Sequence, residues 1–345
     1  MMRIRYVILF LILVASMTWP IRSAINDTFY SFLLSDASSA ISSKKFSGQE
    51  KGTEISIMNF GDAMFDRGVR SAMADGYDPF EFIGKYKFLK AFDFVALNLE
   101  GPITENRRCQ PKEYSFRFAS STALFLRQNG IDAVNLANNH TFDCYGAGVA
   151  DTEKYLSEAG VVYFGSTGIS GFASEKEIKS KKFAFAGIDL TINAVFKEQY
   201  ADSVKDLKTK NDFVIVHVHW GIEYAKQPSA EQVAVAHRLI DAGADAVIGH
   251  HPHVVQPLEI YRGRPIFYSL GNFIFDQIGK DENFGIGAEL IFRGGELSEI
   301  GAHPFVIDRH RPKMLKGEEA EIFCSGFLPS YVGRQTSACF LKLAN

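Results

Sequence analysis

Gly249-His250-His251-Pro252-His253 follows the apolar run at 244–248 and holds three of the nine histidines of this 345-residue chain. A short apolar run that ends at a glycine is typical of a buried strand that stops abruptly. In open α/β sheets, ligands bind beyond the carboxyl ends of the strands. Because His251 and His253 are two residues apart, an extended segment would place both imidazoles on one side. Since imidazole is a common metal ligand, the stretch predicts a metal site; a histidine-rich surface turn is the alternative.

The first two strands expected along the chain, at 54–60 and 92–98, are each followed by a carboxylate. These carboxylates are Asp62 and Glu100. Asp62 could instead cap a helix, since aspartate accepts hydrogen bonds from the free N–H groups at a helix start. Glu100 could instead form a turn. Two metal ions held close together need a bridging carboxylate, and Glu100 is the candidate for that role.

Amide and imidazole side chains follow two later strands. Asn139 and His140 come after the strand expected at 131–136, and an amide oxygen beside an imidazole suits a divalent ion together with a proton donor. An asparagine-rich turn is the alternative. His217 and His219 alternate with the apolar residues of their strand and therefore share one face. His219, nearer the carboxyl end, is the predicted ligand, and His217 is expected to pack.

The donor types together indicate which ions the site would take. Carboxylates, an amide and imidazoles fit manganese, iron or zinc, as one or two divalent ions, and exclude a thiolate site. A further segment at 268–277 alternates like a strand and breaks at Gly271-Asn272. That break either shapes the floor of the pocket or turns the chain.

Composition and element order predict one α/β domain. The chain is 46% hydrophobic and 22% charged, which is ordinary for a globular protein. Its net charge of -3 argues against a nucleic-acid partner, because no basic excess is available to displace counterions. Helices expected at 123–130, 146–159 and 230–242 alternate with strands, and hairpins follow after residue 257. This order predicts a mixed sheet, or two packed sheets, with helices outside.

The N-terminus differs from the rest of the chain. Arg3 and Arg5 precede an apolar run from Tyr6 to Trp19, which is the pattern of a secretory signal peptide. Arg22 fits poorly with cleavage after Ala24, so residues 1–24 are predicted to be a signal peptide or an uncleaved membrane anchor. Either form exports the chain to the periplasm or the cell surface. Residues 25–52 are predicted to be a linker.

The four cysteines are expected to pair in an exported protein. Cys109 and Cys144 lie beyond two of the candidate site motifs, and Cys324 and Cys339 flank a turn near the C-terminus. We hypothesise the disulfides 109–144 and 324–339. Four inert reduced thiols are the alternative.

These motifs resemble the bacterial capsule-synthesis and poly-γ-glutamate-synthesis family (CapA type, PGA_cap domain) of the calcineurin-like metallophosphatase superfamily. The matching segments are GDAMFDRGV (61–69), NLEGPIT (98–104), NLANNHTFDCYGAG (135–148), VHVHWGIEY (216–224) and GHHPHVVQPLEIYRGRPIFYSLGNFIFDQ (249–277). The resemblance implies a four-layer αββα metallophosphoesterase-like sandwich with mixed sheets at 53–310, followed by a C-terminal extension at 311–345. It implies His140 as the general acid and a metal site formed by Asp62, Glu100, Asn139, His219, His251 and His253.

The resemblance also implies a function. It indicates an extracytoplasmic protein of polymer synthesis or export, possessing a metal site that hydrolyses or transfers at a phosphoester or amide. Its expected partners are an anionic surface polymer or precursor, membrane-bound synthase or export components, and the membrane through the N-terminal segment. A non-catalytic subunit that binds polymer or synthase is one alternative, and a generic secreted metallophosphoesterase is another.

One departure from the superfamily pattern bears on the number of ions. The first motif usually reads Asp-x-His, but Met64 stands two residues after Asp62. One imidazole ligand is therefore missing, and a dinuclear site is open to question. Arg67 and Glu223 are predicted to bind substrate or to complete the second site, and the list of predicted substrate-binding residues also includes His250 and Asn272.

Overall fold

The computed structural model describes residues 54–343, except residues 86, 167–170, 193–194 and 329–337. The chain divides into two units, Met1–Glu50 and Lys51–Asn345, and the described residues all belong to the second. The predicted signal peptide or anchor and the predicted linker lie outside the described residues. Within the described part of the chain, no helix combines the length and the apolar character needed to cross a bilayer.

The first sheet has nine strands among the described residues, in the order β14-β13-β12-β1-β2-β3-β4, with β11 paired to β1 and β15 to β13. The strands are β1 (Ile55–Ala63), β2 (Phe94–Leu99), β3 (Ala133–Asn135), β4 (Val162–Phe164), β11 (Asn272–Ile274), β12 (Phe284–Arg293), β13 (Glu296–Asp308), β14 (Arg311–Met314) and β15 (Cys339–Lys342). Strands β1 to β4 run parallel, and β12 to β15 pair antiparallel. The segment expected to be a C-terminal extension thus supplies two strands of this sheet.

The second sheet has six described strands in the order β5-β6-β7-β8-β10-β9. They are β5 (Ala173–Ile178), β6 (Lys181–Asp189), β7 (Phe213–His219), β8 (Ala246–His250), β9 (Leu258–Tyr261) and β10 (Arg264–Phe267). Strands β6, β7, β8 and β10 are parallel, and β9 forms the predicted hairpin with β10. Both sheets are mixed.

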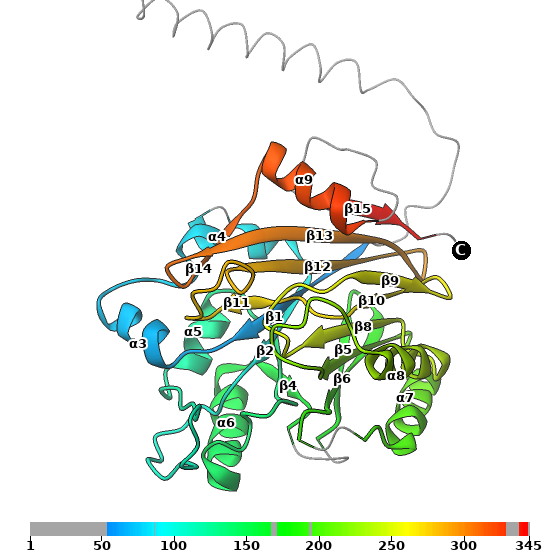
Figure 1. Ribbon diagram of the computed structural model, residues 1–345. Helices are drawn as coiled ribbons and strands as arrows, with labels where there is room; N and C mark the ends of the chain where they lie inside the picture. Colours follow the sequence, from blue (N-terminus) through cyan, green and yellow to red (C-terminus); the bar gives the residue numbers. More distant parts are fainter. Residues whose placement is uncertain (1–53, 86, 167–170, 193–194, 329–337, 344–345) are drawn as a thin grey trace, which may run out of the picture. The chain divides into compact units, whose positions relative to one another are not determined.

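Helices cover the outer face of each sheet (Figure 1). The first sheet carries α3 (Arg67–Ala74), α4 (Glu81–Lys85), α5 (Thr122–Gln128) and α6 (Tyr145–Ala159), and the second carries α7 (Glu198–Lys210) and α8 (Ala230–Asp241). A third, phenylalanine-rich core lies between the sheets. The predicted αββα sandwich is therefore confirmed.

Alternation along β2 shows how the sequence produces these layers. Phe94 and Ala96 belong to the core between the sheets, whereas Val95 and Leu97 belong to the core under the helices. Successive strand residues point to opposite faces, so a strand with both faces buried is apolar throughout, as β2 is up to Leu97.

Two disulfides fasten the edges of the domain. Cys109 is bonded to Cys144, immediately before α6, and Cys324, in α9 (Glu318–Phe327), is bonded to Cys339 in β15. Both hypothesised pairings are present. The first ties the 105–117 loop to the start of α6.

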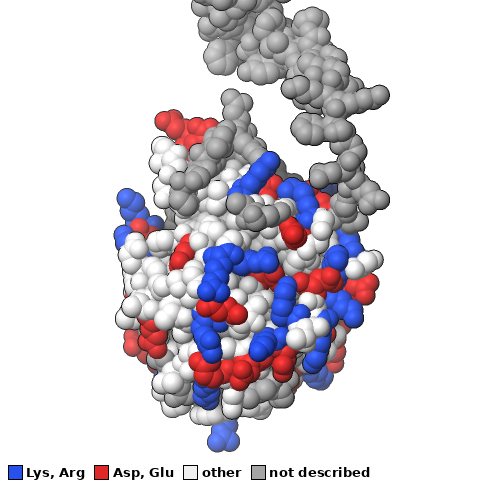
Figure 2. All heavy atoms as spheres, turned by 90° about the vertical axis from the view of Figure 1, so that its right-hand side faces the viewer, with Lys and Arg blue, Asp and Glu red and all other residues white. Residues whose placement is uncertain are grey.

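Charged side chains of both signs are interspersed on the face of the molecule that Figure 2 shows. Ion pairs tie neighbouring elements together, and Asp245 joins Lys208 of α7 to Arg264 of β10. A mixed surface of this kind attracts neither polyanions nor polycations strongly.

Candidate metal centre

At the carboxyl ends of several strands, the side chains that face the space between the two sheets are polar. On β2 the inward positions of Phe94 and Ala96 continue to Asn98 and Glu100, which are both buried. On β7 His217 and His219 share one face, as predicted, and this face lies toward the first sheet: the His217 ring lies 5.0 Å from Phe164 of β4. The space between the sheets is therefore apolar along most of its length and polar at this end.

Asp62 lies at the centre of this polar end. Its Oδ1 accepts a hydrogen bond from Asn98 Nδ2 (2.8 Å), and its Oδ2 accepts from the His251 backbone N–H (3.2 Å). Two imidazole nitrogens lie close to the carboxylate, His250 Nδ1 at 3.5 Å and His253 Nδ1 at 3.3 Å. Burial opposes ionisation, but these two histidines lower the pKa of Asp62 well below its usual range. Asp62 is an ionised, oriented carboxylate.

Two glycines let the strand ends approach one another closely enough to form the site. A Cβ on Gly61 would lie 1.8 Å from the Gly271 carbonyl oxygen, and one on Gly249 would lie 2.0 Å from the Tyr268 carbonyl oxygen. Neither position can hold a larger residue without moving the backbone. The first glycine directly precedes Asp62, and the second begins the histidine cluster.

Glu100 is a buried carboxylate for which the described residues supply no hydrogen-bond donor. Both of its oxygens are inaccessible and unbonded, and the nearest imidazole nitrogens are His253 Nε2 at 3.6 Å and His140 Nε2 at 3.8 Å. Burial raises the pKa of Glu100 well above its usual range, against the opposing effect of His253. Burying a carboxylate without hydrogen-bond donors costs free energy unless a bound cation compensates its charge.

The last two histidines of the cluster lie in a turn. His251 and His253 have left-handed backbones, with φ of 93° and 57°, so the expected extended conformation is wrong. The turn still brings both rings to the site, with their centroids 5.8 Å apart. Burial lowers the pKa of His251 to about 4. For His253, burial is outweighed by Glu100 and Asp62, which raise its pKa to about 9.

Two donor groups that share His253 have the spacing of metal sites. Asp62, Glu100 and His253 form one group, and Glu223, His251 and His253 form the other, each with ligand atoms within 4.8 Å of one another. Carboxylates with imidazoles suit manganese, iron or zinc. Together with the unpartnered Glu100, this donor set fits a divalent ion, and Glu223 belongs to the second group of donors.

Asn139 and His219, also predicted to bind metal, lie next to these donors. Asn139 Oδ1 lies 2.9 Å from His219 Nε2, and the His219 ring lies 4.8 Å from the His251 ring. Burial, followed by the charge of His251, lowers the pKa of His219 well below its usual range. A neutral imidazole is the form that binds a metal.

Met64 lies outside the site. Its side chain is fully buried in the core between the first sheet and its helices, and its sulfur accepts a hydrogen bond from the Asp66 N–H. The position at which the superfamily usually supplies histidine therefore contributes no ligand atom here.

His140 is held by a residue that sequence reasoning did not single out. Its Nδ1 lies 2.8 Å from Asp143 Oδ2, and its ring packs on Phe116 at 4.2 Å. Asp143 is buried, accepts a hydrogen bond from the Phe116 N–H (2.6 Å) and pairs with Lys112. Burial lowers the pKa of His140, and Asp143 opposes that shift. The i, i+3 spacing of a histidine and an aspartate was the available signal.

A cleft of about 400 Å³ opens above these residues. Glu100, His140, His253 and Glu223 line it together with Arg67, Tyr114 and Phe116. The Arg67 guanidinium pairs with Asp276 and lies 5.0 Å from the centre of the Phe116 ring. Arg67 and Glu223 thus lie where a substrate would meet them.

His250 and Asn272, also predicted to bind substrate, are buried and engaged elsewhere. His250 Nε2 lies 3.0 Å from His217 Nδ1, and its other nitrogen faces Asp62. Asn272 Oδ1 lies 2.9 Å from His253 Nδ1. Neither side chain lines the cleft; instead His250 contacts Asp62 and Asn272 contacts His253.

A four-layer sandwich with carboxylate, amide and imidazole donors at the strand ends defines a metallophosphoesterase-like protein. The family model described as bacterial capsule synthesis protein PGA_cap matches residues 56–277, and the chain belongs to this family. The predicted resemblance is therefore confirmed.

Individual relatives agree with this assignment, and a solved structure shares the fold. The chain is 32% identical over 250 residues to the capsule biosynthesis protein CapA of Bacillus anthracis (65% of this chain, 60% of that protein). It is 33% identical over 207 residues to the PGA biosynthesis protein CapA of Bacillus subtilis (strain 168) (54% of each). It thus spans less than two thirds of these relatives. A hypothetical protein from Thermus thermophilus shares the fold, with a TM-score of 0.51 at 19% identity, covering 73% of this chain and 99% of that one.

Proposed function

We propose that this chain is an extracytoplasmic, metal-dependent enzyme in the synthesis or export of an anionic surface polymer of the poly-γ-glutamate type. It would hydrolyse or transfer at a phosphoester or amide bond of the polymer or its precursor. The observation that carries the proposal is Glu100, a buried carboxylate without a donor, in one group with Asp62 and His253 at the bottom of a cleft.

Asp62, Glu100 and His253 would hold one divalent ion, and Glu223 and His251 would complete a second site with His253. Such an ion supplies Lewis acidity to a phosphoryl or carbonyl oxygen and promotes ionisation of an attacking water. The His250 and Asn98 contacts keep the Asp62 carboxylate ionised and oriented toward this site.

His140 is the residue that would deliver a proton to the leaving group. Its Nε2 faces Glu100 and the cleft, while Asp143 fixes Nδ1 and so determines which nitrogen acts. Phe116 covers the imidazole and restricts water. Arg67 would bind an anionic group of the substrate from the rim of the cleft.

Two features support the location and the partners. Disulfides persist in oxidising compartments, and the domain holds two. The relatives whose names mention capsule and PGA biosynthesis support an anionic polymer or its precursor as substrate, with membrane-bound synthase or export components as partners.

The test is turnover by the full chain after metal removal and reloading with manganese, on a panel of phosphoesters and γ-glutamyl amides. His140→Gln should lower turnover about 100-fold while metal content stays unchanged, and His237→Gln, at a surface histidine, should behave as wild type. Absence of turnover on every substrate by the reloaded protein would contradict the catalytic role.

A non-catalytic subunit that binds polymer or synthase is the second candidate. The observation that favours it is Met64, buried away from the site where the superfamily usually places a ligand. Polymer output of cells carrying His251→Ala with His253→Ala separates the two functions. Unchanged output would indicate a binding subunit, and lost output would indicate a working centre.

A further inference from the structure

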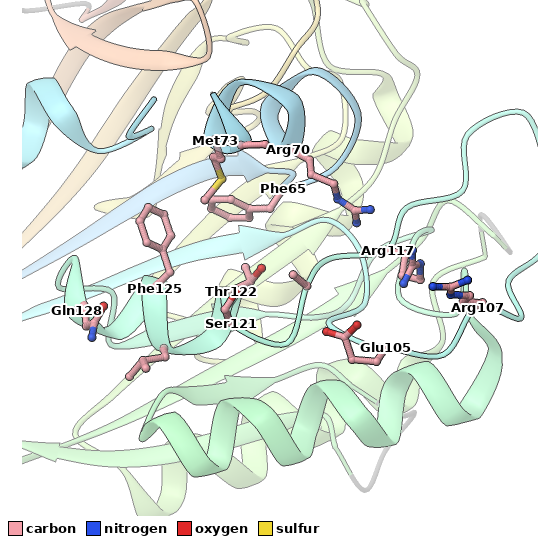
Figure 3. A pocket seen from close by; sticks show the side chains of 13 residues that line it. Phe65, Arg70, Met73, Glu105, Arg107, Arg117, Ser121, Thr122, Phe125 and Gln128 are labelled. Atoms are coloured by element: carbon pink, nitrogen blue, oxygen red, sulfur yellow. The ribbon is translucent and has the colours of Figure 1, made fainter. Parts of the chain in front are cut away.

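A second cleft, of about 610 Å³, opens beside α3 and α5 (Figure 3), and none of the metal donors named above lines it. Its lining includes Arg70, Arg107 and Arg117 on one side, and Phe65 and Phe125 on the other. Figure 3 shows the three guanidinium groups gathered toward one end of the cleft, with Phe65, Met73 and Phe125 toward the other. The cleft therefore has a cationic end and an apolar end.

The arginines at the cationic end outnumber the carboxylates beside them. Arg70 pairs with Asp66 (3.2 Å), whereas neither Arg107 nor Arg117 forms an ion pair with any described carboxylate within 4 Å. Glu105, the acidic residue of the lining, accepts a hydrogen bond from the Ser120 N–H (2.8 Å). Three guanidiniums thus face two carboxylates, and although Glu105 also attracts Arg117 and Arg70 at longer range, the cationic end keeps an excess of positive charge.

The Asp66 carboxylate fixes two of the three arginines. It caps α3, accepts a hydrogen bond from the Arg117 N–H (2.8 Å) and pairs with the Arg70 guanidinium (3.2 Å), so it holds the backbone from which Arg117 extends and the head group of Arg70. Positioned guanidiniums bind carboxylates and phosphates through paired N–H donors.

The apolar end is made of aromatic rings that pack on one another. The Phe65 ring lies 6.3 Å from the Phe125 ring, which in turn lies 5.5 Å from Phe80. Leu124 extends the surface toward solvent. A ligand with methylene groups gains free energy by covering such a surface.

The two clefts share a wall. Arg67 lines the metal cleft and Arg70 lines the second, one helical turn apart on α3. The neighbouring residues Phe116 and Arg117 likewise line the first and the second cleft. A ligand that lies along the second cleft therefore lies next to the cleft into which the metal donors face.

We propose that the second cleft, with Arg107 and Arg117 as its anion-binding residues, holds a polycarboxylate chain beside the metal centre. Carboxylates of the chain pair with the guanidiniums, and the methylenes between them cover Phe65, Met73 and Phe125. A single phosphate would engage the cationic end and leave the aromatic end uncovered. This inference rests on the proposed function, because it makes the cleft the site that holds the polymer during the reaction.

The test is binding of a short fluorescent γ-linked oligoglutamate to the full-length protein, followed by anisotropy at low and at physiological salt. Arg107→Gln with Arg117→Gln should weaken binding about tenfold or more. Arg262→Gln with Arg309→Gln, which removes two charges at side chains that are 67% and 70% exposed, should stay within about twofold of wild type. Metal content should be equal in all three proteins.

Three outcomes would overturn the inference: no binding by wild type, equal binding by both double variants, or arginine-dependent binding to anionic lipid vesicles in place of the oligomer. Metal content and turnover, measured in parallel, separate this failure from that of the proposed function. If the enzyme turns over substrate but oligomer binding does not depend on the arginines, only the proposed role of the second cleft is contradicted. If oligomer binding depends on the arginines but the protein holds no metal and shows no turnover, the catalytic role is contradicted and the proposed role of the second cleft is supported.

Discussion

At the scale of single residues, the site contains two buried carboxylates that differ in their hydrogen bonding. Asp62 is surrounded by donors, and Glu100 has none among the described residues. Their strand-end positions made both predictable. Asn98 and Asp143 were not predicted, because an asparagine or aspartate in a motif shows its partner only once the chain has folded. Alternation along 94, 96, 98 and 100 was the signal that would have found Asn98.

Replacing Glu100 by glutamine should change stability in opposite directions with and without metal. In a chelator, the variant should unfold at a free energy about 1 kcal/mol higher than wild type, because glutamine replaces a carboxyl group whose ionisation is opposed by burial. Manganese at about 100 times its dissociation constant should add about 2.7 kcal/mol to wild type and far less to the variant. Urea denaturation measures both values, with exposed Glu231→Gln as the control. Equal stabilisation of wild type and Glu100→Gln by manganese would refute this role.

At the scale of elements, strands with buried faces were predictable and polar edge elements were not. The strand that contains Phe94, predicted at 92–98, lies at Phe94–Leu99. Helix α7 was missed because two residues in it, Ala201 and Val204, are buried, which leaves a weak apolar pattern. Strand β5 (ASEKEI) was missed because an edge strand with solvent on one side carries charges.

A buried cluster that joins three strands supplies a test at this scale. Glu289 of β12 accepts a hydrogen bond from Ser56 Oγ of β1 (2.6 Å) and lies 2.7 Å from His303 Nε2 of β13. Burial opposes ionisation, but His303 and Ser56 lower the pKa of Glu289. A carboxyl with a lowered folded-state pKa contributes stability above its unfolded pKa of about 4.3 and loses it as the pH falls.

Glu289→Gln should therefore lower the free energy of unfolding by about 2 kcal/mol at neutral pH. The difference from wild type should shrink as the pH falls through about 4. Urea titrations at several pH values measure this, and Glu296→Gln, exposed in the same hairpin, is the matched control. A difference that does not change with pH would show that the charge of Glu289 is not what stabilises the cluster.

At the scale of the whole molecule, the two-sheet sandwich followed from the family resemblance, but the long-range pairing did not follow from local patterns. Strand β1 pairs with β12, more than 200 positions later, and β13 pairs with both β14 and β15. Local alternation indicates that a strand exists and which faces are buried, but not its partner across such a separation. Strands β14 and β15, both after residue 310, accordingly belong to the first sheet.

The disulfide between Cys324 and Cys339 tests how far that C-terminal part stabilises the domain. It closes a separation of 15 residues between α9 and β15, for which loop-closure entropy gives about 3 kcal/mol. Cys324→Ser with Cys339→Ser should lower the free energy of unfolding by about that amount, measured in urea, and leave metal content unchanged. An unaltered unfolding midpoint would mean that the C-terminal strand is held by its sheet pairing alone.

The central claim is that the carboxylates and histidines at the strand ends hold a divalent ion. The most direct measurement is the metal content of the purified full-length protein by elemental analysis, for wild type and for His251→Ala with His253→Ala. The account predicts at least one manganese, iron or zinc ion per wild-type chain after reloading and about a tenth of that or less in the double variant. Equal metal content in the two proteins, or none in wild type, would contradict it.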